Sequence, residues 1–237
     1  MLKVIDISNW QKGFDPATAP VDAVIVKATE GTTFVNPYCD GFVQKAKNSG
    51  KLWGFYHFGG SGNATAEADY FITNCRNYFG DGIPILDWEG NQNVAWVNEF
   101  VRRIHDVTGV WPWIYANPWR FNQGGVEQNC ARWIASYPAV AHPTFTQAAG
   151  WKCPTADGNV VAWQFASDCP VSGWNIDGSL YYGDAFSWHA YAGAKPAPTP
   201  QPMPEPEQPM PEPEQPAKPE SVTLENDQYK VTIESKQ

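Results

Sequence analysis

The sequence has no long apolar run and few basic side chains. None of its 237 residues belongs to a stretch approaching the roughly 18 consecutive apolar residues of a membrane-spanning helix. Only 16 Lys and Arg stand against 25 Asp and Glu, which gives a formal net charge of −9. Nucleic-acid binders need clustered basic residues to neutralise phosphates. We therefore expect no stable membrane insertion and no nucleic-acid partner.

The sequence also lacks the patterns of an exported or metal-binding protein. Residues 1–6 become charged too early for a secretory signal, so we expect synthesis in a cytoplasm without a signal peptide. The five cysteines contain no C-x-x-C pair and the four histidines are scattered, so we expect reduced thiols, no metal and no other cofactor. Cys153 and Cys169, in a loop-rich region, are the candidates if any pair forms.

The composition changes abruptly near Gly193. Proline at every second or third position over residues 195–219 removes backbone donors, which predicts an extended Pro/Glu-rich linker over residues 193–220. Residues 1–192 are predicted to form the main domain. Residues 221–237 alternate apolar and polar side chains like a β-hairpin, but they are too few to bury a core of their own. We interpret this short β segment as the remnant of a binding module or as a strand pair for oligomerisation.

In the main domain, short apolar strands alternate with amphipathic helices, which favours an α/β fold with a parallel sheet covered by helices. One helix is predicted to start at Asn36-Pro37 and end at Gly50, and after Trp133 loops replace the helices. The length is too short for eight complete strand–helix units, which need about 250 residues. We therefore predict a TIM-like (β/α)5(β)3 barrel. A doubly wound open sheet is the alternative, but residues 8–11 are not its Gly-rich turn.

Carboxylates follow several of the predicted strands. They are placed at the C-terminal strand ends, which meet at one face of a parallel barrel, and they comprise Asp6, Asp87, Glu89 and Asp177. In a shared cleft, burial and mutual repulsion should raise at least one pKa, as a general acid requires. Asp87 and Glu89, two apart on one predicted strand, should share a face, while Trp88 points into the barrel–helix layer.

Aromatic and amide side chains are predicted to lie at the same strand ends. Pyranose rings stack on aromatic faces and bond to amides, so this lining suits a glycan; the candidates are Trp10, Tyr56, Tyr115, Tyr137 and Gln164. We interpret Lys27 and Glu30 as an ion pair that braces the cleft. His57 is either a base or a structural histidine bonded to a neighbouring acid.

At these residues the chain resembles the glycoside hydrolase family 25 muramidases, the Chalaropsis-type lysozymes of phage endolysins and bacterial autolysins. The resemblance spans residues 1–190 and is carried by the segments 5–11, 27–31, 54–58, 86–89, 113–115, 133–135 and 162–164, with Asp177 near the end. It implies a (β/α)5(β)3 barrel that cuts the β-1,4 bond between N-acetylmuramic acid and N-acetylglucosamine in peptidoglycan. It also implies that Glu89 is the proton donor and that Asp87, Asp6 and Asp177 complete the cleft.

Two other functions stay open at this point. A non-catalytic glycan-binding module would keep the aromatics and lose an acid, yet all four acids are present. A chitinase-like enzyme would favour a longer barrel and a strand with several spaced Asp before the Glu, whereas only Asp87 precedes Glu89 here. An endolysin-like enzyme is expected to depend on a holin for release from the host cytoplasm and then to act on peptidoglycan strands of the wall.

Overall fold

A computed structural model of the protein describes residues 1–193 and 221–234. Its main body is a closed barrel, because β1 pairs with both β2 and β9. The barrel strands are β1 (Leu2–Ile7), β2 (Ala23–Glu30), β4 (Leu52–Phe58), β5 (Ile83–Asp87), β6 (Trp113–Ala116), β7 (Arg132–Ala135), β8 (Val160–Val171) and β9 (Trp174–Tyr181). The short strand β3 (Phe34–Val35) pairs with the end of β2. The predicted barrel is confirmed and the open sheet was wrong.

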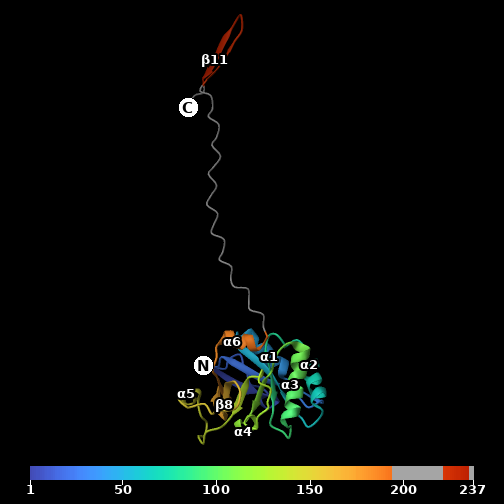
Figure 1. Cartoon of the computed structure of the whole chain (residues 1–237). Coiled ribbons are helices and arrows are strands. Elements are labelled where there is room, and N and C mark those ends of the chain that lie inside the picture. Colours follow the sequence, from blue (N-terminus) through green and yellow to red (C-terminus); the bar gives the residue numbers. More distant parts are fainter. Residues whose placement is uncertain (194–220, 235–237) are drawn as a thin grey trace. The chain divides into compact units, whose positions relative to one another are not determined.

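Helical segments follow the first five barrel strands and cover the outside of the barrel (Figure 1). They are the 3-10 helix η1 (Asn9–Gln11), α1 (Cys39–Asn48), α2 (Ala64–Cys75), α3 (Val94–Thr108) and α4 (Pro118–Phe121). After β7 the connection contains only the single turn α5 (Phe145–Ala148), and α6 (Ala185–Tyr191) follows β9. Among the described residues no helix is long and apolar enough to cross a membrane.

The predicted start of α1 was wrong. The helix begins at Cys39, because Asn36 forms a turn instead of a cap: its side chain accepts from the Tyr38 N–H at 3.0 Å and donates to the Lys27 carbonyl at 2.7 Å. Asx side chains commonly satisfy neighbouring backbone groups in this way. The helix end is formed as predicted near Gly50, which adopts a positive φ of 73°.

The last two barrel strands differ from the prediction. β9 runs antiparallel to both β1 and β8, and β8 continues to Val171 instead of ending at Gln164. The two strands are joined by Ser172 and Gly173, whose φ values of 50° and 81° suit a tight hairpin turn. Asp177 is therefore not at the C-terminal end of a parallel strand, and Gln164 lies within β8.

Side-chain alternation divides the core into two layers. Val4, Ile83 and Ile85 pack inside the barrel with the aromatic ring of Trp113. Their neighbours on the same strands point outward and pack under the helices, as Ile5, Ile7 and Leu86 do. Because successive strand residues face opposite sides, this pattern fixes which polar residues can face the barrel interior.

The C-terminal segment forms a separate two-stranded sheet. β10 (Ser221–Glu225) pairs antiparallel with β11 (Lys230–Glu234), so a hairpin is formed where the alternation predicted one. Residues 194–220 of the linker predicted over residues 193–220 lie outside the described residues, and the domain boundaries stay predictions. The five cysteines are free thiols, with Cys153 half-buried and the others buried, so Cys153 and Cys169 are not bonded to each other.

Candidate active site

The alternation of inward and outward side chains along the strands directs Asp6 and Asp87 toward the barrel interior. Asp6 is two residues beyond the interior-facing Val4 on β1, and Asp87 is two beyond Ile85 on β5. Both carboxyl groups therefore point into the mouth of the barrel. Asp177 reaches the same place from the antiparallel strand β9, where it is the Cα partner of Asp6. Near its start, β9 lies at the face where β1 ends, so its direction does not prevent the two acids from meeting.

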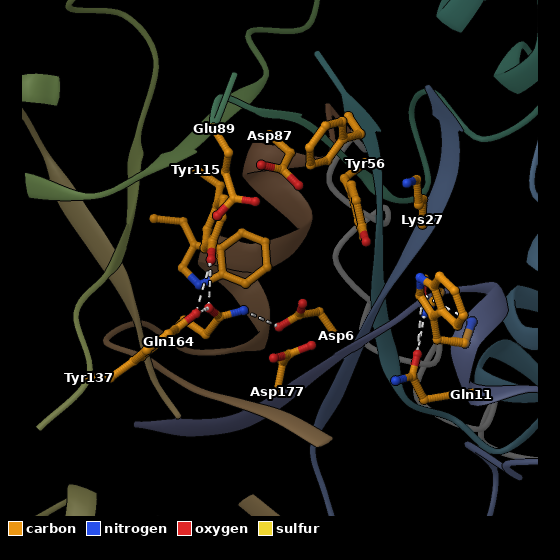
Figure 2. Close-up of a pocket in the computed structure, with 14 residues that line it drawn as sticks. Asp6, Gln11, Lys27, Tyr56, Asp87, Glu89, Tyr115, Tyr137, Gln164 and Asp177 are labelled. Atoms are coloured by element: carbon orange, nitrogen blue, oxygen red, sulfur yellow. Dashed lines mark hydrogen bonds between the residues drawn. The ribbon is translucent and has the colours of Figure 1, made fainter. Parts of the chain in front are cut away.

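These side chains surround one open cleft of about 360 Å³ (Figure 2). The cleft brings together the predicted acids and all the predicted binding residues. Its lining consists of Asp6, Ser8, Trp10, Gln11, Lys27, Tyr56, Phe58, Asp87, Glu89, Tyr115, Trp133, Tyr137, Gln164 and Asp177. Among the described residues, no three His, Cys, Asp or Glu side chains are grouped to hold a metal ion.

Gln164 connects the acids to two tyrosines. Its Oε1 accepts from the hydroxyls of Tyr115 at 2.6 Å and Tyr137 at 2.5 Å, which leaves Nε2 to donate to Asp6 Oδ2 at 2.9 Å (Figure 2). The two hydroxyl donors thus fix which end of the amide faces Asp6. Burial, and then the charge of Asp177, raise the pKa of Asp6 well above its usual value, although the Gln164 donation opposes the rise.

Asp87 is the acid with an unsatisfied buried oxygen. Its side chain is 8% exposed, and within the described residues Oδ1 has no hydrogen-bond partner. Burial, and then the charge of Glu89, raise the pKa of Asp87 well above its usual value, while Lys27 lowers it. A buried acceptor without a donor costs free energy, so it indicates a place where a ligand donates.

Glu89 lies beyond the end of β5, so the prediction that it shares one strand with Asp87 was wrong. The Trp88 N–H donates to the Tyr115 carbonyl at 2.8 Å, and the Trp88 ring packs outward as predicted. Glu89 still lines the cleft beside Asp87. Partial burial raises its pKa, and the charges of Arg120 and Lys27 oppose that rise.

Lys27 is the basic residue of the cleft lining. Its Nζ lies 2.6 Å from Glu30 Oε2 and 4.8 Å from the centre of the Phe58 ring. The predicted brace is therefore confirmed. With one cation against four acids in the lining, the cleft keeps an excess of negative charge that favours protonated carboxyls.

His57 is a structural residue. It is fully buried, its Nδ1 lies 2.8 Å from Thr29 Oγ1 and its Nε2 lies 3.1 Å from Glu67 Oε2. It does not line the cleft. The structural alternative is confirmed and the alternative that His57 is a base was wrong. Burial lowers its pKa, although the hydrogen bond to Glu67 opposes this.

Sequence reasoning missed two kinds of residue near the site. Ser8 and Gln11 enter the lining through a capping box around η1, in which the Gln11 side chain accepts from the Ser8 N–H at 2.8 Å. Their S-x-x-Q spacing is a signal that could have found this turn. Arg120 donates to the Glu89 carbonyl at 2.6 Å, and no pattern in the sequence indicates that contact.

A closed strand–helix barrel with an acidic, aromatic-lined cleft at its mouth has the architecture of a barrel glycoside hydrolase. The comparisons with known proteins agree, since the profile of glycosyl hydrolases family 25 matches residues 5–174. The chain therefore belongs to glycosyl hydrolases family 25.

The chain is also similar to named proteins. The chain is 30% identical to an N,O-diacetylmuramidase of Arthroderma benhamiae over 200 residues, which cover 73% of this chain and 82% of that protein. It is 36% identical to the N,O-diacetylmuramidase of Chalaropsis sp over 136 residues, or 48% of this chain and 64% of that protein. The aligned part thus spans just under two thirds of the Chalaropsis protein.

Solved structures share the fold. A muramidase from Acremonium alcalophilum superposes with a TM-score of 0.66 at 27% identity, covering 81% of this chain and 99% of that one. A bacterial lysozyme from Streptomyces coelicolor superposes with a TM-score of 0.68 at 23% identity, covering 81% and 97%. Because the superpositions cover 97–99% of those chains, 81% of this chain matches almost the whole of each fold.

Proposed function

We propose that the protein is a muramidase that hydrolyses the β-1,4 bond between N-acetylmuramic acid and N-acetylglucosamine in peptidoglycan. The observation that carries this proposal is the cleft itself, in which four carboxyl groups from three distant segments of the chain share one sugar-sized space. The relatives named as muramidases and lysozymes support the same substrate. Aromatic rings and the Gln164 amide supply the stacking faces and hydrogen bonds that sugar rings need.

Glu89 is the proposed proton donor. Its raised pKa favours a proton on the carboxyl at pH values where an ordinary glutamate has lost it. Its position at the rim of the cleft, more exposed than Asp87, suits contact with a glycosidic oxygen between two sugars. Protonation of that oxygen makes the departing sugar an alcohol and lets the bond to the anomeric carbon break.

Asp87 is the proposed partner of the substrate's 2-acetamido group. Its buried, unpartnered Oδ1 can accept from the acetamido N–H, which leaves the acetamido oxygen free to attack the anomeric carbon. Glu89 then takes a proton from the water that opens the resulting ring. Two displacements at one carbon retain its configuration, so methanolysis should give the retained anomer; an inverted product would contradict this mechanism.

The remaining acids and the binding residues have supporting roles in this proposal. Asp6 and Asp177 keep the far side of the cleft acidic, and Gln164 orients Asp6. Tyr56, Tyr115, Tyr137 and Trp10 provide contact surfaces for the glycan, with Trp10 83% exposed at the rim.

The test is the release of new reducing ends from purified peptidoglycan and, separately, from chitin. We expect release from peptidoglycan by the wild type and none by Glu89→Gln. Binding without release would favour the non-catalytic module, and faster release from chitin would favour the chitinase-like alternative.

We further propose that the protein reaches the wall after release from a host cell, with a holin opening the membrane. A solved endolysin, CTP1L, has a similar fold at 26% identity and a TM-score of 0.56. Expression in a bacterial cytoplasm should then leave cells intact until a holin is co-expressed. Lysis without any membrane lesion would contradict the proposed route.

The hairpin is proposed to mediate self-association. Tyr229, Val231 and Ile233 are more than half exposed on it. Light scattering should report an oligomer for the full chain and a monomer after deletion of residues 221–237. A monomeric full chain would contradict this role.

A further inference from the structure

One basic side chain outside the cleft lining reaches the loop that carries Glu89. Arg120 lies on α4, and its Nη2 donates to the carbonyl oxygens of Glu89 at 2.6 Å and Gly90 at 2.7 Å. Its guanidinium carbon lies 5.1 Å from the centre of the Trp88 ring. Arg120 therefore contacts three successive residues of the loop. A planar guanidinium combines stacking with several donors, which a lysine ammonium cannot do.

The short helix α4 is well anchored beneath Arg120. The Asn117 side chain accepts from the Arg120 N–H at 3.1 Å, and Pro118 occupies the first turn. Phe121 is fully buried and meets the Trp88 ring edge-on, with ring centres 6.4 Å apart. The guanidinium is thus presented to the loop from a fixed base.

Gln92 holds the other side of the loop. Its carbonyl accepts from Trp88 Nε1 at 2.8 Å, and its Nε2 donates to the carbonyls of Gly59, at 2.7 Å, and Gly60. A side chain at position 90 would displace the Gln92 amide, since a Cβ there would lie 2.7 Å from Gln92 Nε2. The backbone around Glu89 is therefore held from two directions.

The carboxyl of Glu89 itself has no such support. In residues 1–193 and 221–234, no hydrogen bond or ion pair to its carboxyl oxygens is formed, whereas its carbonyl is bound by Arg120. The direction of the carboxyl is accordingly set by its backbone and by the contacts that hold that backbone.

We propose that Arg120 is a positioning residue for hydrolysis, which holds the Glu89 backbone so that the carboxyl faces the glycosidic oxygen and which places a positive charge beside that carboxyl. The proposal rests on the proposed role of Glu89 as proton donor. Arg120 thus has two separable effects on Glu89: it fixes the direction of the carboxyl, and it places a positive charge beside it.

The charged surroundings of Glu89 define the second effect. Burial raises the pKa of Glu89, and Arg120 opposes the rise more strongly than Lys27 does. The other groups that face Glu89 across the cleft are Asp6, Asp87, Asp177, Tyr56 and Tyr137. Loss of the Arg120 charge should therefore raise the pKa of Glu89 further, and the protonated form should persist to higher pH.

The kinetic experiment compares kcat and KM over pH for the wild type, Arg120→Gln and Arg120→Lys. We expect Arg120→Gln to lose about 10- to 100-fold in kcat with little change in KM, because a misaligned donor slows the chemical step. The basic limb of its pH profile should move to higher pH. Arg120→Lys keeps the positive charge but loses the planar guanidinium that donates to two carbonyls and stacks on Trp88. Its kcat should therefore fall while the basic limb of its pH profile stays in place.

Arg103→Gln is the matched control. Arg103 lies on α3, where its Nε lies 2.7 Å from Asp69 Oδ1, so this variant removes the same charge and a hydrogen bond away from the cleft. It should keep the wild-type kcat and pH profile.

A second measurement does not depend on turnover. Carbon-13 NMR titration of the Glu89 carboxyl, assigned with Glu89→Gln, should show a higher pKa in Arg120→Gln than in the wild type. A wild-type kcat in a folded Arg120→Gln protein would overturn the positioning role, and an unchanged titration would overturn the charge effect. If Arg120→Gln does not fold, Arg120→Lys decides: reduced kcat at an unchanged Tm supports the proposal, and wild-type kcat overturns it. A wild type that releases no reducing ends would instead refute the proposed function.

Discussion

Two regions of the main domain hold buried carboxyl groups, and the pKa of the carboxyl group is lowered in one region and raised in the other. Behind β4, Glu67 lies 3.1 Å from His57 Nε2 and accepts from the backbone N–H groups of Gly60 at 2.7 Å and Gly62 at 2.8 Å. Burial raises the pKa of Glu67, but these donors outweigh it and the pKa is lowered. In the cleft, Asp87 Oδ1 has no donor among the described residues and its pKa is raised.

This difference separates a structural acid from a functional one. The carboxylate of Glu67 fixes the loop after β4, because both of its oxygens accept from backbone N–H groups of that loop. The cleft acids keep acceptor capacity and protons available for a substrate. Burial alone does not distinguish the two regions, because Glu67 is 1% and Asp87 8% exposed.

The largest expected effect comes from the cleft. Glu89→Gln should lower kcat by about 100- to 10,000-fold, the usual contribution of a positioned general acid, because an amide cannot donate the required proton. The far-UV circular dichroism and Tm should stay close to the wild type, since the Glu89 carboxyl supports no hydrogen bond in the described residues. Reducing-end assays and thermal unfolding measure both quantities. Near-normal turnover by a folded variant would reject Glu89 as the donor.

The same substitution in the structural region should have the opposite pattern. Glu67→Gln replaces a carboxylate oxygen that accepts a backbone N–H with an amide donor, so we expect the free energy of unfolding to fall by about 1–3 kcal/mol. Denaturant unfolding measures this loss. Turnover per folded molecule should change far less than in Glu89→Gln. Equal stability of the variant and the wild type would remove the contrast between the two regions.

A third variant, Asp177→Asn, tests through the pH dependence of stability whether the cleft raises the pKa of its acids. Burial, and then the charge of Glu89, raise the pKa of Asp177. Between the ordinary pKa of an aspartate, which applies in the unfolded state, and the raised pKa of Asp177 in the folded state, the folded state binds more protons than the unfolded state. Stability therefore falls as pH rises through that range. Asp177→Asn should raise Tm at pH 8 and lose that advantage below the ordinary pKa of an aspartate. A lower Tm at pH 8 would contradict the raised pKa.

The smallest predicted effect concerns the tyrosines. Tyr137→Phe removes one of the two hydroxyls that donate to Gln164 Oε1, while Tyr115 keeps the amide in place. One neutral hydrogen bond contributes about 1 kcal/mol, so we expect about a fivefold rise in KM or fall in kcat/KM. Steady-state kinetics on soluble glycan fragments would show it. A loss as large as that of Glu89→Gln would mean that Tyr137 takes part in the chemistry.

Much of the fold and the site could be predicted from the sequence. The apolar strands and the amphipathic helices are local signals, so their alternation and the helix end near Gly50 could be predicted. The position of acids at the C-terminal ends of apolar strands is also local, which is why Asp6 and Asp87 were predicted as site residues.

Features that depend on contacts between distant segments were not predictable in this way. The antiparallel direction of β9 follows from the tight turn at Ser172 and Gly173, so Asp177 reached the cleft for a reason other than the predicted one. The contact of Arg120 with the Glu89 carbonyl joins residues 31 positions apart. Local periodicity carries no information about such a pair.

The identity of the sugar at the newly formed reducing end tests the central claim most directly. Purified peptidoglycan digested by the wild-type protein would be reduced with borohydride and analysed by mass spectrometry, with Glu89→Gln as the blank. The proposed chemistry predicts that N-acetylmuramic acid carries the new reducing ends and that the blank contains none. Reducing ends on N-acetylglucosamine, or equal release by Glu89→Gln, would contradict it.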